Sequence, residues 1–171
     1  VMNPGDEVLY PNPGYPIYES QINYQGGVAL PYCYYQTKNG FDIDLDFIAK
    51  SISAKTKVLI LNNYQNPMSA SSSKEELKTL SKLAVENDLW VLSDDAYYEI
   101  RYSKDSPKSI LNFPGMKQRT VILYTFSKKF AMTGWRIGAS IGPESLIKHM
   151  ARFNINDESC TNHFIQHALA S

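Results

Sequence analysis

Several features are scarce in this chain of 171 residues, and each scarcity excludes a class of protein. The formal net charge is zero, because 17 Lys and Arg balance 17 Asp and Glu. No basic field therefore favours binding to nucleic acid or to an anionic membrane. The longest apolar runs, such as 58–61, are far shorter than a membrane span. We expect neither nucleic acid nor a membrane as a partner.

Cysteine and histidine are also rare. Cys33 and Cys160 lie far apart and form neither a metal-type cluster nor a disulfide framework. This use of cysteine predicts a reduced compartment, the cytoplasm. Of the three histidines, His163 and His167 have helical i, i+4 spacing, but no third ligand gathers around them. We predict surface or packing roles for the histidines and no metal site.

What the chain does contain is an alternation of short apolar runs with helical patterns. The predicted strands are 8–10, 28–34, 57–61, 90–94, 121–126 and 135–141, and the predicted helices are 15–25 and the segments that begin near 44, 73 and 143. Strands that alternate with helices indicate an α/β fold, here three-layered, with a mostly parallel sheet flanked by helices. The segment 103–118, which holds two prolines, is predicted to be the least structured.

Two helix starts carry capping signals. Asp44 can cap a helix whose apolar positions include Leu45 and Ile48. Ser73 and Glu76 have the spacing of a capping box, and an apolar stripe follows them. These signals predict where both helices begin.

Polar residues follow three of the predicted strands, in the segments 62–66, 94–97 and 125–128. In parallel α/β sheets, ligands bind outside the carboxyl ends of the strands. The sequence therefore predicts one composite site at this edge of the sheet.

The segment 124–138 indicates which ligand this site takes. Lys128 can condense with an aldehyde through its amine. The hydroxyls of Thr125 and Ser127 and the guanidinium of Arg136 can bind a phosphate. Pyridoxal 5'-phosphate (PLP) is a cofactor with both groups. Taken alone, a Ser-Lys pair after a strand is more often a solvated loop, so the prediction depends on further matches.

Those matches are spread along the chain. They are Asn66-Pro67, Asp94-x-x-Tyr97, Ser127-Lys128 and the run from Gly134 to Gly138, preceded by Pro13-Gly14-Tyr15-Pro16-x-Tyr18 near the start. In this order they resemble the large domain of fold-type I, class I and II PLP-dependent aminotransferases, over essentially the whole chain.

The resemblance implies catalytic roles for three residues. Lys128 would form the Schiff base and carry the proton between the substrate Cα and the cofactor. Asp94 would pair with the pyridine nitrogen and keep it protonated. Tyr97 would hydrogen-bond the phenolic oxygen of the cofactor, and the family spacing selects it over Tyr98. Asp95 receives no catalytic role.

The resemblance also implies how the cofactor is bound. Asn66 would be a second partner of the phenolic oxygen, unless it is only a turn residue before a proline. Tyr15 would stack on the cofactor ring. Thr125, Ser127 and Arg136 would bind the phosphate. We also expect Gly134 and Gly138 to permit close approach of the backbone.

The chain departs from the family's pattern in two ways. Met68 and Ser69 replace the Thr-Gly that usually follows Asn-Pro, so the loop is expected to differ there. The resemblance also implies flanking elements: an N-terminal segment that completes the phosphate site, and a small C-terminal domain that binds the substrate carboxylate. Residues 1–171 would then be an incomplete core of the PLP-binding large domain, inactive alone, within a parent that is a homodimer.

The predicted function is transamination between an amino acid and a 2-oxo acid. One alternative is a PLP-dependent lyase or synthase on the same scaffold, because the same side chains activate Cα whatever leaves next. Another is a non-catalytic aminotransferase-like module. The sequence does not determine which amino acid is the donor.

Overall fold

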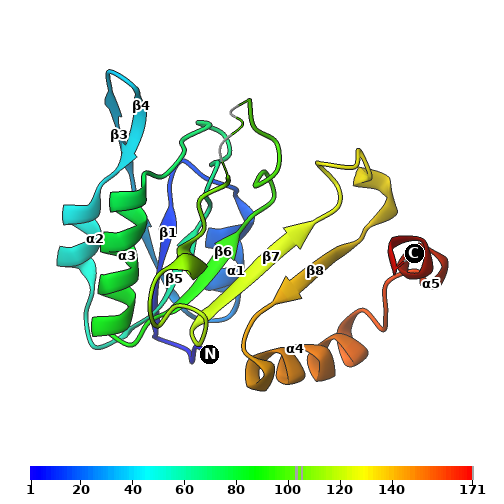
Figure 1. Ribbon diagram of the computed structural model, residues 1–171. Coiled ribbons are helices and arrows are strands. Elements are labelled where there is room, and N and C mark those ends of the chain that lie inside the picture. The colour runs from blue at the N-terminus through cyan, green and yellow to red at the C-terminus, as the bar shows by residue number, and fades with distance from the viewer. Residues whose placement is uncertain (103, 105, 171) are drawn as a thin grey trace.

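The computed structural model describes residues 1–102, 104 and 106–170, and a six-stranded sheet forms its centre (Figure 1). The strands are β1 (Glu7–Pro11), β2 (Val28–Tyr32), β5 (Thr56–Leu61), β6 (Trp90–Asp94), β7 (Thr120–Thr125) and β8 (Gly138–Ile141), in the spatial order β2-β1-β5-β6-β7-β8. All neighbouring pairs are parallel except β7 and β8, which are antiparallel. The predicted mostly parallel sheet is confirmed.

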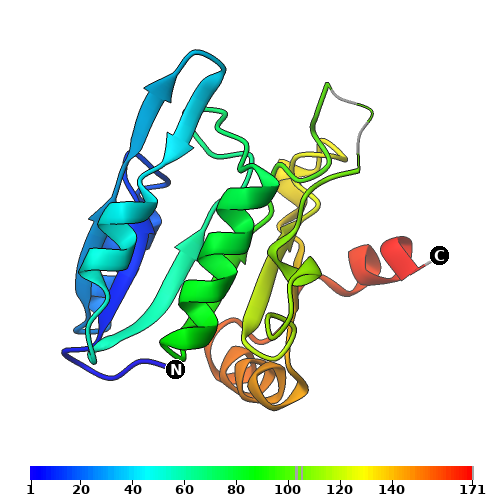
Figure 2. The ribbon, with the colours of Figure 1, turned by 60° about the vertical axis from the view of Figure 1, so that its left-hand side comes forward.

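Helices cover both faces of this sheet. Helix α1 (Ile17–Tyr24) packs on one face, and α2 (Leu45–Ser51) and α3 (Lys74–Glu86) pack on the other (Figure 2). Successive residues of a strand point to opposite faces, so Leu59 faces α2 and α3 while Val58 and Ile60 face α1. Burial on both sides accounts for the continuous apolar run of β5. The predicted three layers are confirmed.

The two capping signals locate their helices correctly. The side chain of Asp44 accepts a hydrogen bond from Phe47 N at 2.9 Å. Ser73 and Glu76 form both bonds of the capping box. Glu76 also accepts a bond from Ile43 N at 2.7 Å, which ties the start of α3 to the neighbouring strand β4 (Gly40–Ile43).

The predicted strand 28–34 is wrong only at its end, after Tyr32. Strand β2 ends at Tyr32, and β3 (Tyr34–Thr37) pairs with β4 in a separate two-stranded sheet. The chain leaves the main sheet at Cys33, whose carbonyl accepts a bond from Asp44 N at 3.0 Å. The apolar run continues through this point, so its pattern did not reveal the break.

The predicted strand 135–141 is likewise wrong in its first half. Thr133–Trp135 forms a short 3₁₀ turn, and β8 begins only at Gly138. A Cβ at Gly138 would lie 2.7 Å from the carbonyl oxygen of Tyr124, so the expected close approach is confirmed there. It is wrong for Gly134, where a Cβ would meet no atom within 4 Å.

The C-terminal part lies at the β8 side of the sheet. Helix α4 (Glu144–Asp157) begins next to Pro143 as predicted, whereas α5 (His163–Ala170) was not predicted. His163 and His167 are exposed, which confirms the surface role. None of the described helices is long and apolar enough to cross a membrane.

The predicted loop 103–118 is partly structured. Residues 103 and 105 of this prediction lie outside the described residues. Further along, Ile110–Asn112 forms a 3₁₀ turn capped by Ser109, and Ile110 and Met116 are buried in the core.

Candidate functional site

A cavity of about 380 Å³ lies where the carboxyl ends of β5, β6 and β7 meet. We call it the strand-end cavity. Its lining includes every residue that the sequence predicted for the site: Tyr15, Asn66, Asp94, Tyr97, Thr125, Ser127, Lys128 and Arg136. Four further residues line it: Tyr18, Asn62, Ala96 and Thr133. The convergence arises because parallel strands present their carboxyl ends at one edge.

Asp94, the last residue of β6, has a hydrogen-bond donor on each carboxylate oxygen. Tyr18 Oη donates to Oδ2 at 2.5 Å, and Ala96 N donates to Oδ1 at 3.2 Å. Burial, and then the charge of Asp94, raise the pKa of the Tyr18 phenol far above its usual range. The phenol therefore remains protonated and serves as a donor.

Asn62 joins the loop after β5 to the end of β6. Its side-chain amide donates to Asp94 O at 2.9 Å, and its Oδ1 accepts a bond from Asn66 N at 3.0 Å. Asn62 is buried, so these bonds are shielded from water. They hold the backbone of Asn66 and of Asp94 on neighbouring walls of the strand-end cavity.

The two adjacent tyrosines after β6 point in different directions. Tyr97 lines the cavity, and Lys128 Nζ lies 5.7 Å from the centroid of its ring. Tyr98 instead packs edge-on against Tyr64, with ring centroids 6.4 Å apart. The turn after β6 thus presents Tyr97, and not Tyr98, to the site.

The two adjacent lysines after β7 are separated in the same way. Lys128 lines the strand-end cavity. Lys129 Nζ pairs with Glu99 Oε1 at 2.7 Å, and the same carboxylate accepts a bond from Tyr124 Oη at 2.5 Å. Lys128 is therefore the amine that faces Asp94 and Tyr97.

Thr125, Ser127 and Arg136 bring anion-binding groups to the cavity. Ser127 N donates to Thr125 Oγ1 at 3.1 Å, and Arg136 Nη1 donates to Thr133 O at 3.0 Å. Arg136 has a φ of 52°, in the left-handed region, which costs an L-residue roughly 1–2 kcal/mol. Such backbone outliers cluster at functional sites.

Tyr15 lies at the rim of the cavity and is 45% exposed. Its ring packs edge-on against that of Tyr18, with centroids 5.9 Å apart. Tyr15 is thus partly accessible at the rim of the cavity.

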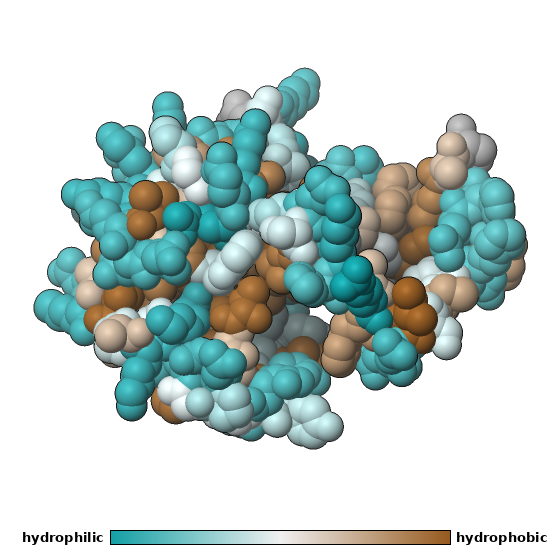
Figure 3. Space-filling model, turned by 90° about the horizontal axis from the view of Figure 1, so that it is seen from below, coloured by the Kyte–Doolittle hydropathy of each residue, from teal (hydrophilic) through white to brown (hydrophobic). Residues whose placement is uncertain are grey.

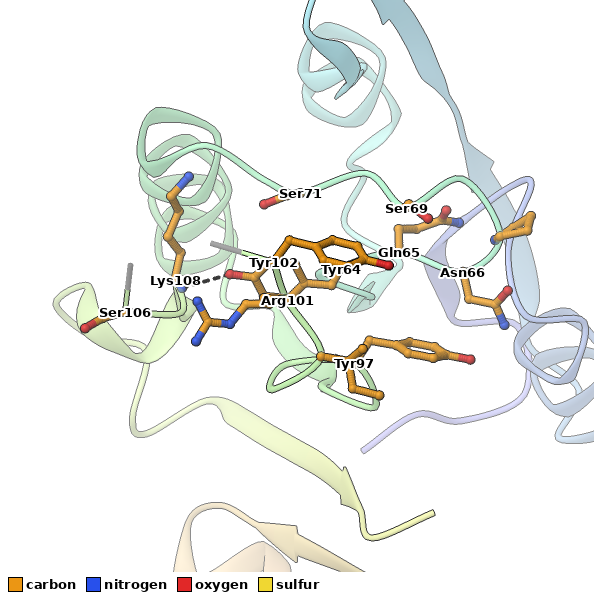
Figure 4. Close-up of a pocket in the computed structure, with 12 residues that line it drawn as sticks. Tyr64, Gln65, Asn66, Ser69, Ser71, Tyr97, Arg101, Tyr102, Ser106 and Lys108 are labelled. Carbon is orange, nitrogen blue, oxygen red and sulfur yellow. Dashed lines mark hydrogen bonds between the residues drawn. The ribbon is translucent and has the colours of Figure 1, made fainter. Parts of the chain in front are cut away.

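A second cavity of about 600 Å³ adjoins the first and shares Asn66 and Tyr97 with it (Figure 4). Figure 4 shows these two residues at one end and the cationic side chains of Arg101 and Lys108 toward the other. Tyr64 lies between them, and its hydroxyl accepts a bond from Lys108 N at 3.3 Å. We call this the side cavity.

The loop that divides the two cavities contains the expected departure from the family pattern. Ser69 has a φ of 57°, in the region that glycine favours. Its amide donates to Gln65 O at 2.7 Å, which closes a tight turn after Asn66. The Asn66–Pro67 peptide bond in this turn is cis.

Comparison with known proteins identifies the family. The family model "Aminotransferase class I and II" matches residues 1–170. The chain belongs to this family, as the resemblance implied.

Named relatives differ in the substrate that their names give. The chain is 37% identical to aromatic-amino-acid aminotransferase 2 of Thermococcus litoralis over 165 residues, covering 96% of the chain and 42% of that protein. It is also 37% identical to an aspartate aminotransferase of Pyrococcus abyssi over 166 residues, covering 97% and 42%.

A solved structure agrees. The aromatic aminotransferase of Pyrococcus horikoshii superposes with a TM-score of 0.92 at 34% identity, over 98% of this chain and 45% of that one. The chain thus spans less than half the length of the proteins that it matches.

Proposed function

We propose that this chain forms the pyridoxal phosphate-binding part of an aminotransferase, and that the intact protein transfers an amino group between an amino acid and a 2-oxo acid. The observation that carries the proposal is that Lys128, Asp94 and Arg136 line one cavity, although Asp94 ends β6 and the other two lie between β7 and β8. Membership of the aminotransferase family supports it.

The residues present fit this cofactor. The strand-end cavity offers an amine for the aldehyde, a carboxylate for the ring nitrogen, and hydroxyls with a guanidinium for the phosphate. The carboxylate is held by two donors, and Tyr15 in the lining offers an aromatic ring on which the cofactor ring could stack. When bound, the cofactor supplies an electron-accepting ring for the electron pair released as the substrate Cα–H bond breaks.

In this proposal, each side chain of the chain has a defined task. Lys128 would hold the cofactor and would then move a proton between the substrate Cα and the cofactor. Asp94 keeps a proton on the pyridine nitrogen. Tyr97 and Asn66 donate hydrogen bonds to the phenolic oxygen, which stabilises its negative charge.

The remaining residues bind and orient the cofactor. Thr125, Ser127 and Arg136 hold the phosphate, and the guanidinium can make two parallel bonds to it. Tyr15 stacks on the ring, a contact that adds about 0.5–1.5 kcal/mol beyond its buried area. Correct orientation at the reacting carbon is itself a large part of catalysis.

The principal competing function is a lyase or synthase reaction on the same residues. A direct test incubates the intact protein with PLP, candidate amino acids and 2-oxoglutarate, and measures glutamate formation against release of pyruvate. We expect glutamate, and Lys128→Ala should abolish its formation, whereas Lys129→Ala should retain most of the rate. Pyruvate release without glutamate would instead establish the lyase, and equal loss in both variants would remove Lys128 from its assigned role.

Two properties of the intact protein complete the proposal. A homodimer is implied by the family, and exposed apolar side chains on the C-terminal part support a contact surface there. They include Ile141, Phe153, Ile155 and Phe164, and hydrophobic residues appear at the surface on the right of Figure 3. A cytoplasmic location stays a prediction, supported by two free and exposed cysteines, Cys33 and Cys160.

A further inference from the structure

Tyr18 makes a polar contact with the site that the sequence did not indicate. It lies on α1 and is only 6% exposed, yet its hydroxyl reaches Asp94 Oδ2 at 2.5 Å across 76 positions of sequence. Its ring packs in the core cluster that includes Val8, Ile22 and Ile60. Docking of α1 on the sheet thus delivers one phenolic hydroxyl to the carboxylate.

The packing leaves this hydroxyl little freedom. Tyr18 and Ile22 are the buried residues of α1, so the same contacts that hold the helix also fix the phenol. The ring of Tyr15 also packs against that of Tyr18, with centroids 5.9 Å apart. A side chain held in this way loses little further entropy when it makes its hydrogen bond.

The bond has a defined chemical effect on Asp94. A hydrogen bond from a neutral donor to a carboxylate is charge-assisted and stabilises the ionised form. It also occupies Oδ2, while Ala96 N occupies Oδ1, so rotation of the carboxylate would break both bonds. If Tyr18 served only to pack in the core, its ring would be needed but its hydroxyl would not.

We propose that Tyr18 is a positioning residue, whose hydroxyl orients the Asp94 carboxylate so that Asp94 can hold the proton on the pyridine nitrogen of the cofactor. This inference rests on the proposed function. It adds a residue, and an element, to the catalytic arrangement: α1 sets the orientation of a carboxylate on β6.

Several other titratable groups lie near Tyr18 and Asp94. Across the strand-end cavity, Asp94 shares the lining with Tyr15, Tyr97, Lys128 and Arg136. On its own strand end, Asp95 is engaged by Ser93 at 2.8 Å. Tyr34 also helps to raise the pKa of the Tyr18 phenol electrostatically. Among these, Tyr18 is the side chain for which the structure records a hydrogen bond to the Asp94 carboxylate.

The test compares Tyr18→Phe with Tyr24→Phe in the intact protein. Tyr24 lies on the same helix but is 83% exposed, so its variant controls for loss of a phenolic hydroxyl from α1. The first measurement is the ¹³Cγ chemical shift of Asp94 at pH 7 without cofactor, in protein with labelled aspartate and assigned with Asp94→Asn. Tyr18→Phe should move this resonance, because the carboxylate loses a hydrogen bond, and Tyr24→Phe should leave it in place.

The second measurement uses protein loaded with PLP labelled with ¹⁵N in the ring. In Tyr18→Phe the nitrogen should lose its proton at a pH about one unit lower than in the parent. We expect kcat to fall about tenfold with KM nearly unchanged. In an Asp94→Asn background, Tyr18→Phe should have no further effect on kcat, because its target is gone.

The outcomes separate this inference from the function on which it rests. An unchanged ¹³Cγ shift of Asp94 in folded Tyr18→Phe, with a lowered melting temperature only, would reduce Tyr18 to a packing residue and overturn the inference. A changed ¹³Cγ shift in protein that binds no PLP would support the contact but refute the proposed function, and with it the role toward the pyridine nitrogen.

Discussion

Asp95 shows how differently two adjacent carboxylates can be placed. Asp94 faces the strand-end cavity, whereas Asp95 is only 7% exposed and accepts a bond from Ser93 Oγ at 2.8 Å. Burial, which outweighs the opposing effect of Ser93, and the charge of Asp94 raise the pKa of Asp95 from 3.8 to about 6. Asp95 therefore carries its charge at neutral pH at a cost to stability.

The sign of this effect gives a stability prediction. Because folding raises the pKa of Asp95, the folded state binds its proton more tightly, and stability falls as pH rises from about 3.8 through about 6. Asp95→Asn should remove that loss and stabilise the intact protein by about 1–3 kcal/mol at pH 7, with a much smaller effect near pH 4. Chemical denaturation at both pH values measures this.

An exposed aspartate provides the control. Asp157→Asn, at the end of α4, should change stability little at either pH. An Asp95→Asn variant that is destabilised equally at pH 4 and pH 7 would contradict this prediction. The carboxylate would then be needed for packing, and burial of its charge would not lower the stability.

At the scale of single elements, local signals predicted helix starts better than strand boundaries. The helices after Asp44 and Ser73 begin where their caps indicate, because capping depends on residues close in sequence. The ends of two strands were wrong. The departure of the chain at Cys33 and the start of β8 at Gly138 depend on partners elsewhere, Asp44 and β7 respectively.

The capping box of α3 yields a prediction at this scale. Ser73→Ala removes the side-chain acceptor for Glu76 N and should destabilise the intact protein by about 0.5–2 kcal/mol. Ser71→Ala, at an exposed serine just before the cap, is the matched control and should have little effect. Thermal unfolding of both variants gives the comparison, and equal melting temperatures would mean that the box contributes nothing measurable.

At the scale of the whole molecule, the sheet order explains why the site could be predicted in outline. The alternation of strands and helices implied parallel strands, and the polar segments after β5, β6 and β7 then had to meet at one edge. Residue chemistry indicated the aldehyde- and phosphate-binding roles of Lys128, Thr125, Ser127 and Arg136, whereas the roles of the other site residues came from the resemblance to a family.

What the sequence did not reveal are contacts between distant segments. Tyr18 and Asn62 reach Asp94 across 76 and 32 positions respectively, and no local spacing encodes such bonds. The side cavity was missed for the same reason, since it forms between the loop after β5 and the segment after β6. These features depend on how helix and loop dock on the sheet.

The central claim is that Lys128 holds the cofactor, and one measurement tests it most directly. The intact protein is incubated with PLP, reduced with borohydride, digested and analysed by mass spectrometry. We predict the pyridoxyl mass on Lys128, because this amine lines the strand-end cavity whereas Lys129 is paired with Glu99. A pyridoxyl group on Lys129, or none on either lysine, would contradict the account.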